Sequence, residues 1–266
     1  MALSSLLERY DSVILDLDGC VWIGERCTRE APAAIAELRA AGKSLVFVTN
    51  DARRSPEEYV RKLWALGVRA SLEEVLTVGA TIQFVLADRV RAAGTYVIGS
   101  PAIFRHVADA GQRIVNHTDR AATAELVVVA AHDELDYAEL RTATRAVLAG
   151  AEMLAAGRDR NFPEDDGFAP GTGAIVAALE YATGSTADSV GKPDARIFEA
   201  ALDRLGDGRT LVVGDRLDAD LAGATAAGLD GAIVLSGVSR RAEAEAASEP
   251  APVAIAEDLH ELITGH

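Results

Sequence analysis

The sequence contains few cysteines and few aromatic residues. Its 266 residues include two cysteines, Cys20 and Cys27, and aromatic side chains make up 5% of the chain. Two cysteines cannot cross-link a chain of this length into a disulfide scaffold, and their spacing matches no zinc-binding pattern. A chain this long can bury a sizeable hydrophobic core without such cross-links. We therefore expect a cytoplasmic protein, because thiols stay reduced there.

Long hydrophobic runs are also lacking. No apolar run approaches the roughly 18 to 20 residues that span a membrane as a helix. Residues 1–12 have no basic region followed by a long apolar stretch, so the sequence predicts no signal peptide. We expect no membrane partner.

Positive charge is scarce, because 41 Asp and Glu residues outnumber 26 Lys and Arg residues and give a net charge of −15. This balance argues against nucleic acid as a partner, because nucleic-acid binding depends on a basic surface. It also repels anionic substrates. A phosphorylated substrate would therefore need local positive charge from a metal ion and a few lysines or arginines.

The glycine-rich motifs of nucleotide cofactors are missing. Gly171 and Gly173 precede a predicted helix, but Val176 occupies the position where a G-x-G-x-x-G motif would end. No G-x-x-x-x-G-K-[ST] motif occurs either. We interpret the two glycines as part of a plain turn.

Apolar runs of strand length alternate with segments of helical spacing. The strands predicted from these runs are 13–17, 45–49, 95–98, 126–131, 210–213 and 232–235. The predicted helices are 31–41, 56–66, 80–93, 137–148, 172–182 and 194–205. In the second helix, Trp64 continues an apolar stripe and is predicted to be buried. The alternation predicts an α/β fold with a mostly parallel sheet.

Polar residues gather where several predicted strands end. Asp16 and Asp18 follow the first strand with one residue between them, so they can point to the same site. Ligands of parallel sheets bind at the carboxyl ends of the strands. The polar residues at these ends, together with one lysine at a helix start, are Asp16, Asp18, Thr49, Asn50, Lys192, Asp215 and Asp220. Carboxylates, a hydroxyl, an amide and a lysine at one sheet edge predict a site for phosphate and a metal ion.

The segment between Thr49 and Lys192 is far longer than one or two strand–helix units require. We therefore predict an inserted second domain over residues 79–188 that covers the site. Residues 1–78 and 189–266 would then form the catalytic core.

Four motifs in order resemble the haloacid dehalogenase-like (HAD) superfamily of phosphatases. They are DLDG at 16–19, the strand ending in Thr49-Asn50, GKP at 191–193 and GDRLDAD at 214–220. The insertion resembles the C2-type α/β cap of subfamily IIA, which contains nitrophenyl phosphatase-like, phosphoglycolate and glycerol-phosphate phosphatases. The resemblance implies a Rossmann-like parallel-sheet core with an inserted α/β cap. It also implies a phosphoric monoester hydrolase that acts on a small phosphorylated metabolite, with p-nitrophenyl phosphate as an artificial substrate.

The same resemblance assigns roles to the strand-end residues. Asp16 would attack phosphorus and form an aspartyl-phosphate, and Asp18 would act as general acid and then general base. Mg²⁺ would be held by the Asp16 carboxylate, the Asp18 backbone carbonyl and the Asp215 carboxylate. Asp220 would bind a metal-bound water or orient Lys192. The residues that would neutralise the phosphate are Thr49, Asn50 and Lys192.

This chain departs from the family pattern at two places. The second motif usually reads T-N-N, whereas this chain has Asp51 in the third position, which puts a negative charge near the phosphate. The cap loop usually carries a T-N-x-D-like stretch, and residues 156–161 differ from it. The candidates for leaving-group contacts in the cap are His132, Asp133, Arg158, Asp159, Arg160 and Asn161.

Other functions stay open at this point. A phosphotransferase or mutase of the same superfamily would share the core motifs, and a non-catalytic phosphometabolite-binding protein would be expected to have lost one of them. A signalling receiver domain is disfavoured, because it is about half as long and lacks the acid two residues after the nucleophile. Similar proteins form dimers through the cap, so a homodimer is a further expectation. The core motifs leave the substrate open among glycerol phosphate, phosphoglycolate, sugar phosphates, nucleotides and pyridoxal phosphate.

Overall fold

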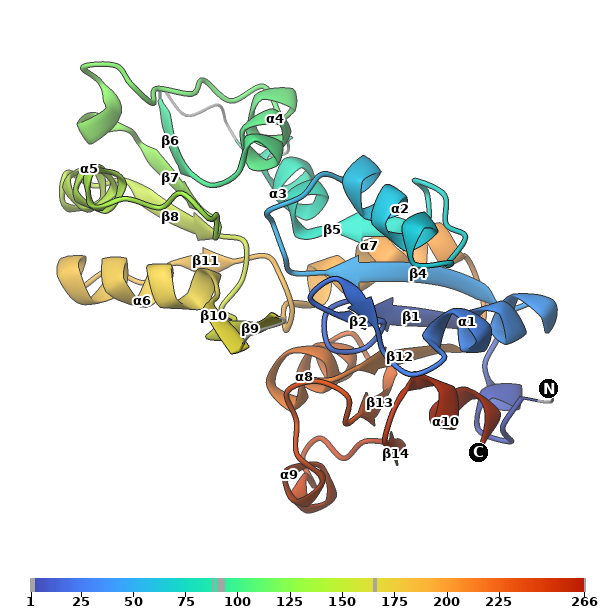
Figure 1. The fold of residues 1–266 in the computed structure, drawn as a ribbon. Helices are drawn as coiled ribbons and strands as arrows, with labels where there is room; N and C mark the ends of the chain where they lie inside the picture. Colours follow the sequence, from blue (N-terminus) through green and yellow to red (C-terminus); the bar gives the residue numbers. More distant parts are fainter. Residues whose placement is uncertain (1–2, 88, 90–93, 165–166, 266) are drawn as a thin grey trace.

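The central feature of the fold is a six-stranded, fully parallel sheet, seen in a computed structural model that describes residues 3–87, 89, 94–164 and 167–265 (Figure 1). The strand order is β14-β13-β12-β1-β4-β5, so β1 lies in the middle. Their bounds are β1 Ser12–Asp16, β4 Ser44–Thr49, β5 Val75–Thr77, β12 Thr210–Gly214, β13 Asp230–Val234 and β14 Ala254–Ala256.

Helices cover both faces of this sheet, because successive side chains of a buried strand point to opposite faces. Val13 and Leu15 of β1 pack in a cluster with α1 (Ala31–Ala40), α2 (Pro56–Ala65) and α10 (Leu259–Thr264). Ile14 packs on the other face with α3 (Val78–Ala87), α7 (Ala195–Leu205) and α8 (Ala222–Ala226). The short helix α9 (Arg241–Ala246) packs near β14.

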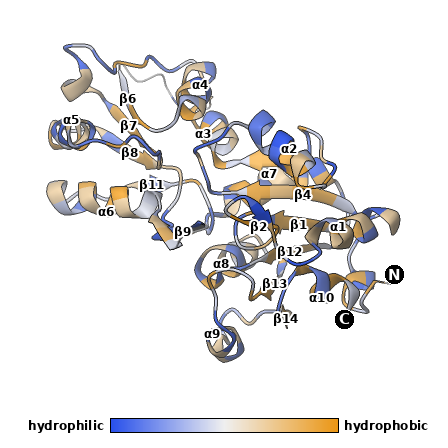
Figure 2. Ribbon diagram, in the orientation of Figure 1, coloured by the Kyte–Doolittle hydropathy of each residue, from blue (hydrophilic) through white to orange (hydrophobic). Residues whose placement is uncertain are grey.

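A second parallel sheet has the order β11-β8-β7-β6. Its strands are β6 Thr95–Ile98, β7 Leu126–Val129, β8 Glu152–Ala155 and β11 Asp188–Ser189. One face packs on α5 (Tyr137–Leu148) and α6 (Thr172–Thr183), and the other packs on α3 and α4 (Pro101–Asp109). Because the cluster around α3 also contains residues of β1 and β4, apolar contacts join the two sheets. Most strands of the two sheets are coloured as hydrophobic, whereas the short β11 is not (Figure 2).

Two antiparallel hairpins complete the fold. One consists of β2 (Trp22–Ile23) and β3 (Arg26–Cys27), just after β1. The other consists of β9 (Asn161–Glu164) and β10 (Gly167–Pro170) and lies between the two sheets (Figure 1). In the described part of the chain, no helix is long and apolar enough to cross a membrane.

The predicted α/β fold with a parallel sheet is confirmed. The six predicted strands correspond to β1, β4, β6, β7, β12 and β13, and the predicted helices to α1, α2, α3, α5, α6 and α7. The end of the helix predicted over 80–93 reaches residues 88 and 90–93, which lie outside the described residues. The division into a core of 1–78 and 189–266 and an insertion of 79–188 remains our interpretation.

The prediction that Trp64 is buried is wrong. Its side chain is 57% exposed, whereas Tyr59 and Leu63 form the buried side of α2. Trp64 instead lies near the end of the helix, where its indole Nε1 donates to the Ala70 carbonyl at 2.8 Å. The indole therefore ties α2 to the following loop.

Candidate active site

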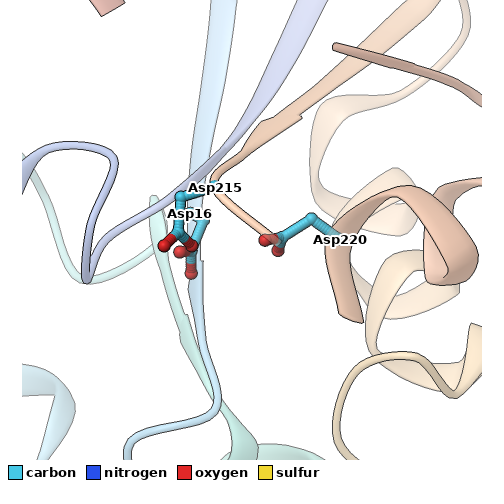
Figure 3. Close-up of side chains that lie close together, drawn as sticks. All are labelled: Asp16, Asp215 and Asp220. Atoms are coloured by element: carbon cyan, nitrogen blue, oxygen red, sulfur yellow. The ribbon is translucent and has the colours of Figure 1, made fainter. Parts of the chain in front are cut away.

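Three carboxylates meet at the carboxyl end of the central sheet. Asp16 is the last residue of β1, Asp215 directly follows β12, and Asp220 lies in a helical turn just beyond (Figure 3). One carboxylate oxygen from each lies within 4.8 Å of the other two, and all three residues are buried. The close packing follows from the sheet order, because β1 and β12 are adjacent parallel strands that end at the same edge.

Lys192 is the cation of this cluster. Its ammonium forms ion pairs with Asp16 and, at 2.7 Å, with Asp220, and the residue is 4% exposed. Asn50 holds the lysine backbone, because its Oδ1 accepts from Lys192 N at 2.8 Å and its Nδ2 donates to Lys192 O at 3.0 Å. Burial alone would lower the pKa of Lys192, but the charges of Asp16 and Asp220 outweigh it and raise the pKa. Lys192 is therefore a fixed positive charge.

Asp215 is the most enclosed of the carboxylates. Its Oδ2 accepts from Val238 N at 2.6 Å, whereas its buried Oδ1 has no hydrogen-bond partner. A Cβ atom at Gly19, where φ is +85°, would lie 2.3 Å from Asp215 Oδ2, and one at Gly237 would lie 1.9 Å from it. These glycines let the backbone close around the carboxylate. Burial, with a contribution from the charge of Asp220, raises the pKa of Asp215 to about 7.

The cluster fits a divalent cation. Three buried carboxylates face a single ammonium, and Oδ1 of Asp215 has no partner. An excess of buried negative charge is costly unless a cation balances it. Oxygen-rich sites of this kind suit Mg²⁺. Asp16 and Asp215 would hold the ion, and Asp220 lies close enough to contact it or its water while orienting Lys192.

Asp18 lines the same pocket but makes its hydrogen bonds outside this cluster. Its Oδ1 accepts from the indole Nε1 of Trp22 at 2.8 Å, and its Oδ2 accepts from the Thr49 hydroxyl at 3.3 Å. Burial raises the pKa of Asp18, and the nearby charge of Asp51 raises it further. The two acids of the D-x-D motif therefore have different surroundings: Asp16 contacts the lysine, and Asp18 contacts neutral donors.

Except for Asp220, these residues line a pocket that lies between the two sheets. Residues of the main sheet and its loops that line it are Asp16, Asp18, Thr49, Asn50, Asp51, Ala52, Lys192, Asp215, Arg216 and Val238. The predicted cap contributes Ala131, Asp159, Asn161, Phe162, Gly171 and Thr172. A substrate bound over Asp16 would therefore have its leaving group against the cap residues.

Of the six leaving-group candidates in the cap, Asp159 and Asn161 line the pocket. Asp159 accepts from Asn50 Nδ2 at 2.7 Å and so links the cap loop to the second motif. The structure does not bring the other four to the pocket. Arg158 pairs with Glu180 at 2.9 Å, His132 Nε2 lies 3.2 Å from Glu139, and Asp133 and Arg160 are exposed.

The sequence analysis did not single out Phe162 and Arg216, which line the pocket, or Arg53, which contacts the lining residues Asp51 and Phe162. Arg216 donates to the carbonyl of Asn161 at 3.0 Å and to Asp218 at 3.1 Å, so it connects the fourth motif to the cap. Its position directly after Asp215 was a usable signal, because a residue next to a metal ligand at a strand end must lie near the site. Nothing in the sequence alone marked Phe162.

Comparison with known proteins identifies the family. A profile described as haloacid dehalogenase-like hydrolase matches residues 13–113, and a second HAD-hydrolase-like profile matches residues 189–262. D-glycerol 3-phosphate phosphatase from Mycobacterium tuberculosis is 36% identical over 264 residues, which are 98% of this chain and 73% of that protein. The chain belongs to the haloacid dehalogenase-like hydrolase family.

Other family members agree with this assignment. An acid sugar phosphatase from Staphylococcus aureus is 30% identical over 97% of this chain and 98% of its own length. A crystal structure of the M. tuberculosis glycerol phosphate phosphatase in complex with magnesium aligns with a TM-score of 0.87 at 35% identity, covering 98% of this chain and 78% of that one.

The predicted resemblance to HAD phosphatases is thus confirmed, as is a hydrolase of the phosphoric monoester class. The magnesium complex of the relative and the carboxylate cluster of this chain agree with the prediction of Mg²⁺ as cofactor.

Proposed function

We propose that this HAD hydrolase is a Mg²⁺-dependent phosphatase that cleaves small phosphate monoesters through an aspartyl-phosphate. The observation that carries the proposal is the position of Asp16, which is buried on the pocket floor between the Lys192 ammonium and the Asp215 carboxylate. A carboxylate in this position has a cation beside it to receive the phosphoryl oxygens, and its neighbours hold it in one orientation.

The reaction has two displacements. In the first, a carboxylate oxygen of Asp16 bonds to phosphorus as the ester P–O bond breaks, and Asp18 gives a proton to the departing alkoxide. In the second, Asp18 takes a proton from water as the water oxygen attacks phosphorus, and the Asp16–phosphorus bond breaks to release inorganic phosphate. The raised pKa of Asp18 suits a group that must first hold a proton.

Charge neutralisation is the main task of the remaining residues. Lys192 contacts Asp16, the Thr49 hydroxyl donates to Asp18, and both residues line the pocket, where they would contact the phosphoryl oxygens. Asn50 is committed to Lys192 and Asp159, so we assign it the positioning of the lysine rather than direct catalysis. Mg²⁺, when bound, supplies further positive charge for the transferring phosphoryl group.

The pocket wall favours an uncharged leaving group that carries hydroxyls. Among the described residues that line the pocket, the cap contributes the carboxylate Asp159, the amide Asn161 and the hydroxyl Thr172, but no lysine or arginine. Arg216 reaches the pocket from the core, but its charge is paired with Asp218, and three of its five N–H donors bond to Asp218 and the Asn161 carbonyl. A carboxylate on the leaving group would meet the Asp159 carboxylate, and the nearest pocket cation, Arg216, is already paired with Asp218. The names of the glycerol phosphate and acid sugar phosphatases among the relatives support the same substrate class.

The test is phosphate release from a panel of esters, with Mg²⁺ and with a chelator. The panel would contain glycerol 3-phosphate, a hexose phosphate, phosphoglycolate and p-nitrophenyl phosphate, with Asp16→Asn protein as the blank. We expect metal-dependent release that vanishes in the variant, and faster turnover of glycerol or sugar esters than of phosphoglycolate. Near-normal release by Asp16→Asn would contradict the nucleophile, and no release from any ester would favour a phosphometabolite-binding protein.

The assembly of the protein is a separate proposal. We infer that residues 79–188 act as the cap over the core of 1–78 and 189–266, in keeping with the cap residues that line the pocket. Association of two chains through the cap would double the mass seen by light scattering relative to a monomer.

A further inference from the structure

Arg53 lies in the loop that follows β4 and contacts both the main sheet's loop and the hairpin β9–β10. Its Nε and Nη2 donate to the two carboxylate oxygens of Asp51 at 2.9 and 3.1 Å. Its Nη1 donates to Glu164 at 3.0 Å, and its Cζ lies 3.9 Å from the ring centre of Phe162. The guanidinium therefore makes a bidentate ion pair with Asp51. It also forms an ion pair with Glu164 and stacks on the ring of Phe162.

The core side of this contact bears on phosphate binding. Asp51 lines the pocket directly after Thr49 and Asn50, at the position where the family pattern usually has asparagine. An unpaired carboxylate there would repel the phosphate dianion. The Arg53 guanidinium neutralises this charge through its bidentate ion pair with the Asp51 carboxylate. The backbone N–H of Arg53 also donates to Asp51 at 3.0 Å.

The contacts of Arg53 with the hairpin β9–β10 affect how the leaving group is held. Phe162 and Asn161 of β9 line the pocket, but β9 pairs only with β10 among the described strands. A lone two-stranded hairpin is marginally stable and takes its position from tertiary contacts. Arg53 and Arg216 are two such contacts, through Glu164 and Phe162 and through the Asn161 carbonyl respectively. Asp133, at 3.5 Å from Arg53, adds a further acid on the cap side.

We propose that Arg53 is a positioning residue with two separable effects: it neutralises Asp51 on the pocket wall, and it fixes the hairpin that carries Asn161 and Phe162 against the core. The first effect governs affinity for the phosphoryl group. The second governs how the leaving group is held. Since Asp51 and the hairpin contact different atoms of one guanidinium, variants can separate them.

The charge effect is tested by the affinity for inorganic phosphate, measured by calorimetry with Mg²⁺ present. We expect Arg53→Ala to weaken phosphate binding by about tenfold, because it leaves a partly buried carboxylate unpaired beside the anion. In a protein that already carries Asp51→Asn, the same change should weaken binding by less than about twofold. Arg241→Ala, which removes an exposed arginine paired with Glu245 and Glu257, is the matched control. Equal losses in both backgrounds would overturn the charge effect.

The hairpin effect is tested by ester kinetics and rests on the proposed function. Arg53→Lys keeps a positive charge near Asp51 but loses the flat guanidinium that lies over Phe162. We expect it to bind phosphate within about threefold of the unchanged protein, yet to lower kcat for glycerol 3-phosphate by about tenfold. Glu164→Gln should lower kcat in the same direction and leave phosphate binding unchanged. Unchanged kcat in both variants would overturn this effect.

The phosphate-binding and ester-kinetic measurements distinguish a failure of this proposal from a failure of the proposed function. If the unchanged protein hydrolyses no ester, the proposed function fails, while phosphate binding still decides the role of Arg53 at Asp51. If Arg53→Ala lowers the melting temperature so far that it does not fold, the comparison of Asp51→Asn and Glu164→Gln with the unchanged protein decides instead. Weaker phosphate binding in Asp51→Asn would then contradict the proposal, because removing the carboxylate should maintain or improve it.

Discussion

At the scale of single residues, Asp215 shows how the chain prepares a cation site. The backbone at Gly19 and Gly237 closes over this carboxylate, and one of its oxygens lacks any partner. A proton or a metal ion must therefore balance its charge. Burial raises its pKa to about 7 from an ordinary value of 3.8, so the two compete near neutral pH.

The competition predicts how Mg²⁺ affinity depends on pH. Metal binding needs the ionised carboxylate, so a proton must leave Asp215 when its pKa is about 7. The apparent affinity should rise about tenfold between pH 6 and pH 8 and level off above. Calorimetric titration of the metal-free protein measures it. A flat affinity over this range would contradict the assignment of Asp215.

The raised pKa of Asp215 also determines how the stability of the metal-free protein changes with pH. Because the folded pKa of Asp215 lies above the unfolded one, its stabilising contribution is complete below about pH 4 and is lost as the pH rises through 7. Asp215→Asn cannot ionise, so the metal-free variant should gain melting temperature relative to the unchanged protein between pH 5 and pH 8. Mg²⁺ should remove this gain, because it binds the ionised form of the unchanged protein.

Lys192 carries the opposite charge, and its removal should be costly. Lys192→Met would leave Asp16 and Asp220 buried without their ammonium partner. Breaking a buried pair in this way costs about 3 to 5 kcal/mol of unfolding free energy. Denaturant unfolding of the metal-free protein measures it. Arg241→Met, which removes an exposed arginine paired with the exposed Glu245 and Glu257, is the control and should cost much less.

At the scale of elements, the sequence was informative where an apolar run ended in polar residues. The D-x-D pair that begins at the last residue of β1, and Thr49 at the last residue of β4, marked the ends of neighbouring strands, and the sheet order brings them together as expected. The sequence analysis did not predict β5 and β11, because strands of three and two residues are too short to show a periodic pattern. The hairpin β9–β10 escaped as well, since Pro163 interrupts its strand pattern.

The cap loop shows why the leaving-group residues were harder to predict. The sequence placed four consecutive polar residues, 158–161, in one stretch, but it could not say which would face the pocket. The structure turns Asp159 and Asn161 inward and lets Arg158 pair with Glu180 of α6. That choice depends on where α6 lies, which is a tertiary effect that no local pattern encodes.

The start of α6 gives a test at this scale. Gly173 has no left-handed backbone angle, and a Gly-to-Ala change inside a helix normally stabilises by about 1 kcal/mol. Here a Cβ would lie 2.3 Å from the Arg158 carbonyl and 2.8 Å from that of Asp159. We therefore expect Gly173→Ala to destabilise by about 1 to 3 kcal/mol and to displace the cap loop.

Denaturant unfolding decides the sign of this change. Stabilisation would show that the loop moves away freely, and that the close approach of α6 does not position Asp159. With destabilisation, turnover of glycerol 3-phosphate should fall along with stability, because Asp159 and Asn161 lie in the loop that the new methyl group pushes.

At the scale of the whole molecule, an acidic protein must attract an anionic substrate. The net charge of −15 repels phosphate esters at long range, whereas Lys192 and the cation site attract them at contact distance. Salt separates the two, since the screening length falls from about 30 Å at 0.01 M to about 8 Å at 0.15 M. Salt screens the electrostatic contacts inside the buried cluster far less than it screens the long-range repulsion from the surface charges.

This balance predicts an unusual salt dependence. With Mg²⁺ kept saturating, kcat/KM for glycerol 3-phosphate should rise roughly two- to threefold between 0.01 M and 0.15 M salt, because the repulsion during encounter is screened. The rise should be larger for phosphoglycolate, which carries one more negative charge, while kcat for both esters stays constant. A fall in kcat/KM with salt would mean that the positive groups of the site, and not the net charge, set the field that an approaching ester meets.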